Sequence, residues 1–174
     1  MIEVDGLTVI IDTGAGNDKS RPRMAVLSDL QTGFLASLRS AGVDPADVDV
    51  VVNTHLHFDH VGWNTMRANG SWVPTFPNAR YLIPEPDYRH FGPDGPPAQT
   101  TAPPDTEEEA SVQQHVRTVF EDSVSPLGDQ IELWSGGHRL SESMWLRPAP
   151  GHTQGASVVW LDAGKTRCSS ATSP

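Results

Sequence analysis

The stretch His55-Leu56-His57-Phe58-Asp59-His60 decides how the rest of this sequence is interpreted. It brings three imidazoles and one carboxylate together, and these are the side chains that bind a divalent metal such as zinc. The chain has only seven histidines, so chance gathering of surface histidines at a strand end is a poor explanation for three of them here. The stretch therefore predicts a metal-binding loop.

The segments on either side of this loop predict an α/β fold. The β-branched run 48–52 predicts a buried strand that ends at the histidines, and the run 7–11 predicts a second strand that ends at the turn Asp12-Thr13-Gly14. Between them, apolar residues recur at helical spacing over 30–41, before Gly42. Downstream, we expect a loop or short hairpin over 63–78, a helix over 107–120, and strands over 79–83, 131–134, 144–147 and 157–161.

Length and composition limit the domain organisation. A chain of 174 residues suits one domain. We expect that domain to cover 1–163, with a flexible segment over 91–106 and a disordered tail over 164–174, where apolar alternation stops.

Charge and apolar patterning narrow the function and the cellular location. The net charge of -10 argues against a basic nucleic-acid-binding face, and the apolar runs are too short for a membrane span. With Cys168 as the only cysteine, no internal disulfide can form, and the first residues are acidic where a secretory signal would be basic. The sequence therefore predicts a cytoplasmic protein with a small-molecule substrate and no nucleic-acid or membrane partner.

Three segments together resemble a known family. His55-Leu56-His57-Phe58-Asp59-His60 resembles the HxHxDH signature of the metallo-β-lactamase superfamily. Asp12, at the end of a predicted strand, resembles the early aspartate of that family. Gly151-His152-Thr153-Gln154-Gly155 resembles its GHTPG motif, with Gln154 where proline is usual. The resemblance runs from about residue 7 to residue 161 and implies a metallo-β-lactamase-like αββα sandwich, here incomplete.

The resemblance also implies roles for these residues. One Zn²⁺ would be held by His55, His57 and His152, and Asp59 and His60 would belong to a second metal position. Asp12 would support the metal loop. A metal-bound water, whose pKa falls toward about 7, would be the nucleophile, and Asp59 could accept or pass a proton.

Some expected features are missing. Family members with two metals have a bridging aspartate after the GHTPG motif and a later histidine, and we find neither. Asp162 follows a predicted strand directly, and we interpret it as a turn residue; Cys168 lacks a supporting glycine pattern. The sequence thus suggests a domain shortened at both ends, with an incomplete second metal site and exposed sheet edges that could self-associate.

The remaining aromatic and histidine residues are less informative. Because they follow the metal loop, Trp63, Asn64 and Phe76 are candidates for a substrate pocket. In contrast, His90, His115 and His138 lack a partner cluster, and we interpret them as surface residues.

Three functions remain open. The first is a zinc-dependent hydrolase acting on a small ester, lactone or related compound. The second is a shortened homologue that binds metal but is catalytically impaired. The third is an iron-dependent oxygenase on the same scaffold, because ligand type alone does not choose the metal.

Overall fold

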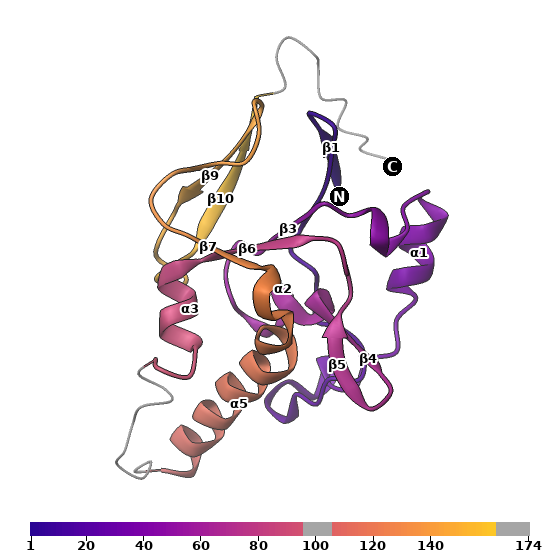
Figure 1. Ribbon diagram of the computed structural model, residues 1–174. Coiled ribbons are helices and arrows are strands. Elements are labelled where there is room, and N and C mark those ends of the chain that lie inside the picture. The colour runs from indigo at the N-terminus through magenta and orange to yellow at the C-terminus, as the bar shows by residue number, and fades with distance from the viewer. Residues whose placement is uncertain (96–105, 163–174) are drawn as a thin grey trace, which may run out of the picture.

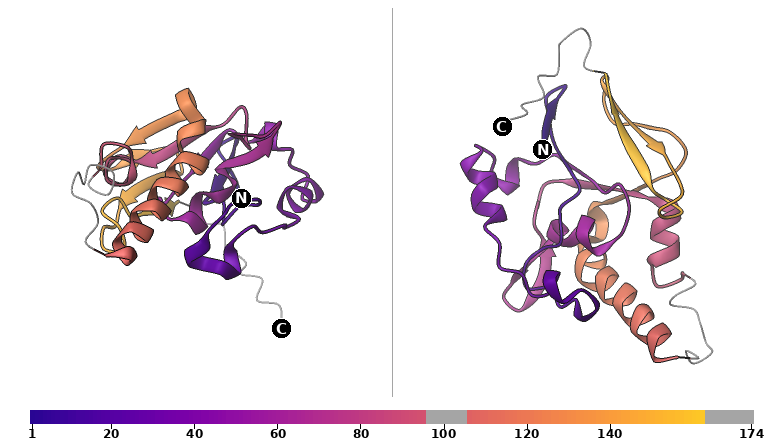
Figure 2. Two further views of the ribbon diagram at one scale, coloured as in Figure 1. Left: turned by 90° about the horizontal axis from the view of Figure 1, so that it is seen from below. Right: turned by 180° about the vertical axis from the view of Figure 1, so that it is seen from behind.

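Two β-sheets face each other, and helices cover the other side of the larger sheet (Figures 1 and 2). The structure is a computed structural model that describes residues 1–95 and 106–162. The larger sheet has the strand order β1-β2-β3-β6-β7, the smaller sheet has the order β10-β9-β8, and β4 and β5 form a hairpin.

The strands are β1 (Ile2–Val4), β2 (Leu7–Ile11), β3 (Val50–Val52), β4 (Thr65–Ala68), β5 (Ser71–Pro74), β6 (Arg80–Pro84), β7 (Ile131–Trp134), β8 (His138–Arg139), β9 (Met144–Pro148) and β10 (Ser157–Leu161). The α-helices are α1 (Phe34–Ser40), α2 (Phe58–Val61), α3 (Glu85–Phe91) and α5 (Glu107–Ser123). Short 3-10 helices cover Pro22–Leu27, Pro45–Asp47, Gly62–Asn64 and Ser125–Gln130.

The centre of the larger sheet is parallel. Strand β3 pairs in parallel with β2 on one side and with β6 on the other, and β6 pairs in parallel with β7. All three residues of β3 are buried, as expected for a strand covered on both faces. Because parallel strands end at the same edge of a sheet, the segments that follow β2, β3 and β6 lie close together.

Each face of the larger sheet has its own apolar core. On one face, Val51 and Tyr81 pack against helices α1, α2 and α5. On the other face, Val50 and Leu82 pack against the smaller sheet, to which Leu146 belongs. The three-stranded sheet and α5 therefore lie on opposite sides of the larger sheet (Figure 1).

These layers confirm the predicted α/β class. Helices, the larger sheet and the smaller sheet form three of the four layers of an αββα sandwich, so the described fold is incomplete. The outward side chains of β10 are exposed, including Val158 (49%) and Trp160 (54%), while Val159 packs inward. No helix in the described ranges is long and apolar enough to cross a membrane.

We expect the exposed face of β10 to mediate self-association. Replacing Trp160 with lysine should shift the protein toward monomer, because the substitution removes exposed apolar area and adds a charge. Sedimentation velocity over a range of concentrations measures the shift. The control Gln114→Lys adds the same charge on the exposed side of α5. A wild-type protein that is monomeric at every concentration, or an equal shift in both variants, would contradict this prediction.

Most elements lie where the sequence predicts them, with one informative difference. The helix expected over 30–41 begins only at Phe34. Upstream of it, the Asn17 side chain accepts a hydrogen bond from the Thr32 backbone N–H (2.8 Å) and donates one to the Thr32 carbonyl (3.0 Å). These bonds hold Thr32 in a loop, so a contact distant in sequence overrides the local helical spacing.

Several elements were not expected. Strands β1 and β8 and helix α3 go beyond the predicted set, and the predicted hairpin over 63–78 is present as β4 and β5. Of the segment expected to be flexible, Phe91 ends α3, and residues 96–105 lie outside the described residues. The predicted tail over 164–174 lies outside them too.

Candidate metal centre

The candidate metal centre lies at the edge where the parallel strands end. The loop after β3 carries His55 and His57 and continues into α2, which begins at Phe58. A second loop, between β9 and β10, carries His152 to the same place. In sheets of this kind, ligands bind outside the carboxyl ends of the parallel strands.

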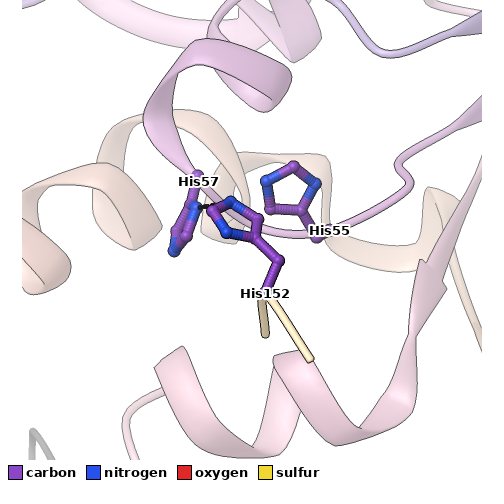
Figure 3. A group of neighbouring side chains, drawn as sticks. All are labelled: His55, His57 and His152. Atoms are coloured by element: carbon purple, nitrogen blue, oxygen red, sulfur yellow. Dashed lines mark hydrogen bonds between the residues drawn. The ribbon is translucent and has the colours of Figure 1, made fainter. Parts of the chain in front are cut away.

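Three histidines converge at this edge. Each of His55, His57 and His152 offers a ring nitrogen, and these nitrogens all lie within 4.8 Å of one another. The ring nitrogens Nδ1 of His57 and Nε2 of His152 are 3.0 Å apart, and Figure 3 shows the three rings side by side. His55 is buried, His57 is half-buried and His152 is exposed, so the cluster opens to solvent on one side.

The histidine cluster fits a metal ion chemically. The Nε2 atom of His55 is buried without a hydrogen-bond partner in the described structure, a state that costs about 1–3 kcal/mol and that a metal bond would relieve. Burial, together with the His60 and His57 rings, lowers the pKa of His55 to about 4, and burial and His152 also lower the pKa of His57. Both rings are therefore neutral at pH 7, as metal ligands must be. Nitrogens sharing a tetrahedral zinc ion at about 2.0–2.1 Å stand about 3.3 Å apart, so small shifts would complete the fit.

Asp12 ties the histidine loop to the end of β2. One carboxylate oxygen accepts a hydrogen bond from the Thr54 backbone N–H (2.8 Å), and the other accepts one from the Thr54 hydroxyl (2.7 Å). The second oxygen also lies 2.9 Å from Nδ1 of His60. Asp12 thus contacts both sides of the loop that carries His55 and His57.

Asp59 and His60 lie next to the three histidines. The His60 ring centroid is 3.9 Å from that of His55, and Nε2 of His60 is 3.6 Å from a carboxylate oxygen of Asp59. Neither belongs to the group of nitrogens that lie within 4.8 Å of one another. Their side chains are partly exposed, 31% for His60 and 47% for Asp59, so they border the solvent side of the site.

An open hollow of about 560 Å³ adjoins the exposed side of the cluster. His90 forms part of its wall. Its neighbours in the sequence indicate no role, because His90 lies outside any cluster of metal-binding residue types. The amide of Gln154 lies 3.5 Å from Nδ1 of His90 on the same wall. The hollow is lined by His57, His90, Phe91, Pro150, His152 and Gln154, together with Gly151 and Thr153.

The residues predicted to line a substrate pocket lie elsewhere. Asn64 and Phe76 have no exposed surface, which puts them in the interior instead of on a pocket wall. The Asn64 side chain bonds to Asn53 and accepts a hydrogen bond from the Thr13 hydroxyl (3.0 Å), and the Phe76 ring belongs to the helix-side core. Trp63 lines a different hollow together with Asp12.

Three further interpretations made from the sequence concern His115, Asp162 and Cys168. His115, expected on the surface, is half-buried with its ring 5.4 Å from that of Phe58. The backbone N–H of Asp162 donates to the Ser143 carbonyl at the end of β10. Cys168 lies outside the described residues.

Comparison with known proteins places this arrangement in context. The family model described as the metallo-beta-lactamase superfamily matches residues 1–166. The N-acyl homoserine lactonase AttM of Azorhizobium caulinodans is 38% identical over 63 residues, which cover 36% of this chain and 20% of that protein. The AttM lactonase of Agrobacterium fabrum is 36% identical over 67 residues, 38% of this chain and 22% of that protein.

The fold also matches solved structures. A hydrolase named AbOPH, of the beta lactamase superfamily, has a TM-score of 0.67 at 22% identity, and the match covers 92% of this chain and 50% of that chain. The chain therefore spans about half the length of this structure, and a smaller share of the curated relatives that it matches.

Proposed function

Because the chain belongs to the metallo-β-lactamase superfamily, whose family model matches residues 1–166, we propose that it is a zinc-dependent hydrolase of a small ester, lactone or related compound. The observation that carries this proposal is the convergence of His55, His57 and His152 at the end of the parallel strands, with Nε2 of His55 buried and unpartnered. Three histidines with an open side form a ligand arrangement of catalytic zinc sites.

In the proposed mechanism, the zinc ion and the side chains of the chain have different roles. When bound, zinc would polarise the substrate carbonyl and make water acidic enough to react at neutral pH. His55, His57 and His152 would hold that ion, and Asp12 would keep the loop in place through Thr54 and His60. The Asp59 carboxylate, partly exposed beside His60, would accept a proton at one of its oxygens and pass it to the leaving group. Asp59 and His60 would also border a second metal position, which we propose to be incomplete.

The proposed substrate class rests on the surroundings of the cluster. The residues that line the open hollow include three histidines, Pro150 and Phe91, and none of the eight is a lysine or arginine. Such a wall suits an uncharged ester or lactone better than a phosphate backbone. The relatives named as N-acyl homoserine lactonases support a lactone in particular. The single cysteine supports a reducing compartment, and we propose the cytoplasm.

A metal titration combined with a hydrolysis assay tests the proposal. The zinc-loaded protein should hydrolyse an N-acyl homoserine lactone or an aryl ester, and Asp59→Asn should keep at least one zinc ion while hydrolysis falls by about 10²–10⁴-fold. Inductively coupled plasma mass spectrometry measures the zinc, and pH-stat titration measures ring opening. Failure to bind zinc after reconstitution, or equal activity in Asp59→Asn, would overturn the proposal.

One observation favours a second candidate, a metal-binding homologue without turnover. Within the described residues, the group of converging nitrogens contains three histidines and no carboxylate oxygen. One equivalent of tightly bound zinc with no hydrolysis of either substrate would favour this candidate. About two equivalents with measurable hydrolysis would exclude it, and oxygen uptake that depends on ferrous ion would point instead to an oxygenase.

A further inference from the structure

Asp87 is a buried carboxylate that bridges the two loops carrying the histidine cluster. It lies in the first turn of α3 and has no exposed surface. One of its oxygens accepts hydrogen bonds from the Leu56 backbone N–H (3.1 Å) and from the Thr153 hydroxyl (2.9 Å). The other oxygen accepts one from the Gly155 backbone N–H (2.6 Å). A third element therefore joins two loops that are about a hundred residues apart in sequence.

Two of the three donors to Asp87 are immediate neighbours of the histidines. Leu56 separates His55 from His57, and Thr153 directly follows His152. Any displacement of the Asp87 carboxylate therefore moves both loops, and with them the spacing of the ring nitrogens. Ser157 makes a separate connection to Thr54 at the base of the loop, where its backbone N–H and hydroxyl donate to the Thr54 carbonyl (3.0 and 2.9 Å).

Gly155 allows this close approach. A Cβ atom on Gly155 would lie 2.8 Å from the carboxyl carbon, one carboxylate oxygen and the backbone nitrogen of Asp87, closer than a Cβ contact normally comes. Thr153 and Gly155 are two of the residues that make up the segment Gly151-His152-Thr153-Gln154-Gly155. At these two positions a hydroxyl donates a hydrogen bond to Asp87, and a glycine leaves room for the Asp87 carboxylate.

The charge of Asp87 is unusual for a purely structural residue. Among the described residues, no lysine, arginine or histidine forms an ion pair with it, and a buried carboxylate without a counter-charge is costly. Hydrogen bonds from three donors offset that cost. Asp87 also acts on His57: burial lowers the pKa of His57, and the Asp87 charge opposes that change.

We propose that Asp87 is a positioning residue that sets the distance between the His55–His57 loop and His152, and so preorganises the pocket for a divalent cation. The inference rests on the proposed metal site and adds a residue to it. It assigns Asp87 no contact with substrate. Its effect is on how tightly and in what geometry the three histidines bind the ion.

Variants at both ends of the Thr153 hydrogen bond test this role. Asp87→Asn keeps the shape but cannot accept all three hydrogen bonds, and we expect its zinc dissociation constant to rise roughly 10–100-fold, as for other outer partners of metal ligands. Thr153→Val removes one hydroxyl without changing the volume much, and should weaken zinc binding by a smaller factor. Thr153→Ser keeps the hydroxyl and should bind zinc like the wild type.

Two readouts separate positioning from a merely structural role. Zinc affinity is measured by competition with a chromophoric chelator on the full chain, and the absorption bands of the cobalt-substituted protein report ligand geometry. If Asp87 only stabilises the fold, Asp87→Asn and Thr153→Val will lower the free energy of unfolding of the metal-free protein, while affinity and the cobalt spectrum stay those of the wild type. That result would overturn the inference. A wild-type protein that binds no zinc would instead refute the metal site itself. If Asp87→Asn does not fold, the Thr153→Val and Thr153→Ser pair decides alone.

Discussion

Replacing His55 with alanine is expected to abolish zinc binding at the three-histidine cluster and to reduce hydrolysis to the uncatalysed rate. His55 is the buried member of the cluster, and its Nε2 has no other partner in the described structure. The loss of affinity should exceed the roughly 10–100-fold typical of residues that only support a ligand. Isothermal titration calorimetry measures the zinc affinity, and the lactone assay measures the rate of hydrolysis.

The stability of the metal-free protein distinguishes loss of a ligand from loss of the fold. Removing the His55 ring loses packing but also removes an unpartnered buried nitrogen, so the two changes partly offset each other. The free energy of unfolding should therefore change little. His138→Ala serves as the control, because this histidine lies on β8 and contacts Trp134 and Glu132. Zinc affinity of His55→Ala within a factor of two of the control would refute the assigned role.

Replacing Asp122 with alanine is expected to be the most destabilising single change. Asp122, near the end of α5, accepts two hydrogen bonds from the Arg21 guanidinium (2.7 and 2.8 Å), and Lys19 Nζ lies 3.4 Å from it. The Arg21 and Lys19 side chains have no exposed surface, and Lys19 Nζ is also 3.8 Å from the centroid of the Trp72 ring. Burial lowers the pKa of Lys19 to about 8, and the charge of Asp122 opposes this change. Asp122 is thus the counter-charge for two buried cations.

Loss of this carboxylate should lower the free energy of unfolding by about 3–5 kcal/mol, because two buried positive charges would lose their opposite charge. Urea denaturation followed by circular dichroism measures the change. Glu108→Ala is the matched control. It removes an exposed ion pair with Arg23, which also joins α5 to the segment that carries the two buried cations. We expect the control to unfold like the wild type.

If Asp122→Ala does not fold, Lys19→Met, which removes one cation, should lose less stability than Asp122→Asn. Equal stability of Asp122→Ala and Glu108→Ala would contradict the prediction.

The sequence anticipated the elements whose pattern is local. A β-branched run predicted a strand that ends at the histidines, and β3 is that strand, although it begins two residues later than expected. Helix α2 begins within the motif, at Phe58. Such features depend on neighbouring residues alone, so composition and periodicity reveal them. The helix that begins late at Phe34 marks the limit of this approach, since a hydrogen bond to Asn17 decides where it starts.

The residues that only the tertiary structure identified depend on distant partners. Asp87 and His90 lie in a short helix, Glu85-Pro86-Asp87-Tyr88-Arg89-His90-Phe91, whose many charged residues are typical of a solvent-exposed helix. Nothing in that stretch distinguishes Asp87, which is buried, from Glu85, which forms an i,i+4 ion pair with Arg89. The difference arises because the donors to Asp87 come from two loops elsewhere in the chain.

By itself, the sequence determined the metal-binding residue types, the α/β pattern and the resemblance that led to the family. The close approach of His152 to His55 and His57, the burial of Asn64 and Phe76, and the bridging position of Asp87 were decided only by the tertiary structure. The physical reason is the same in each case. The type of each residue is a local property of the sequence. The burial of a side chain, and the meeting of side chains from distant loops, depend instead on how parallel strands bring those loops to one edge of a sheet.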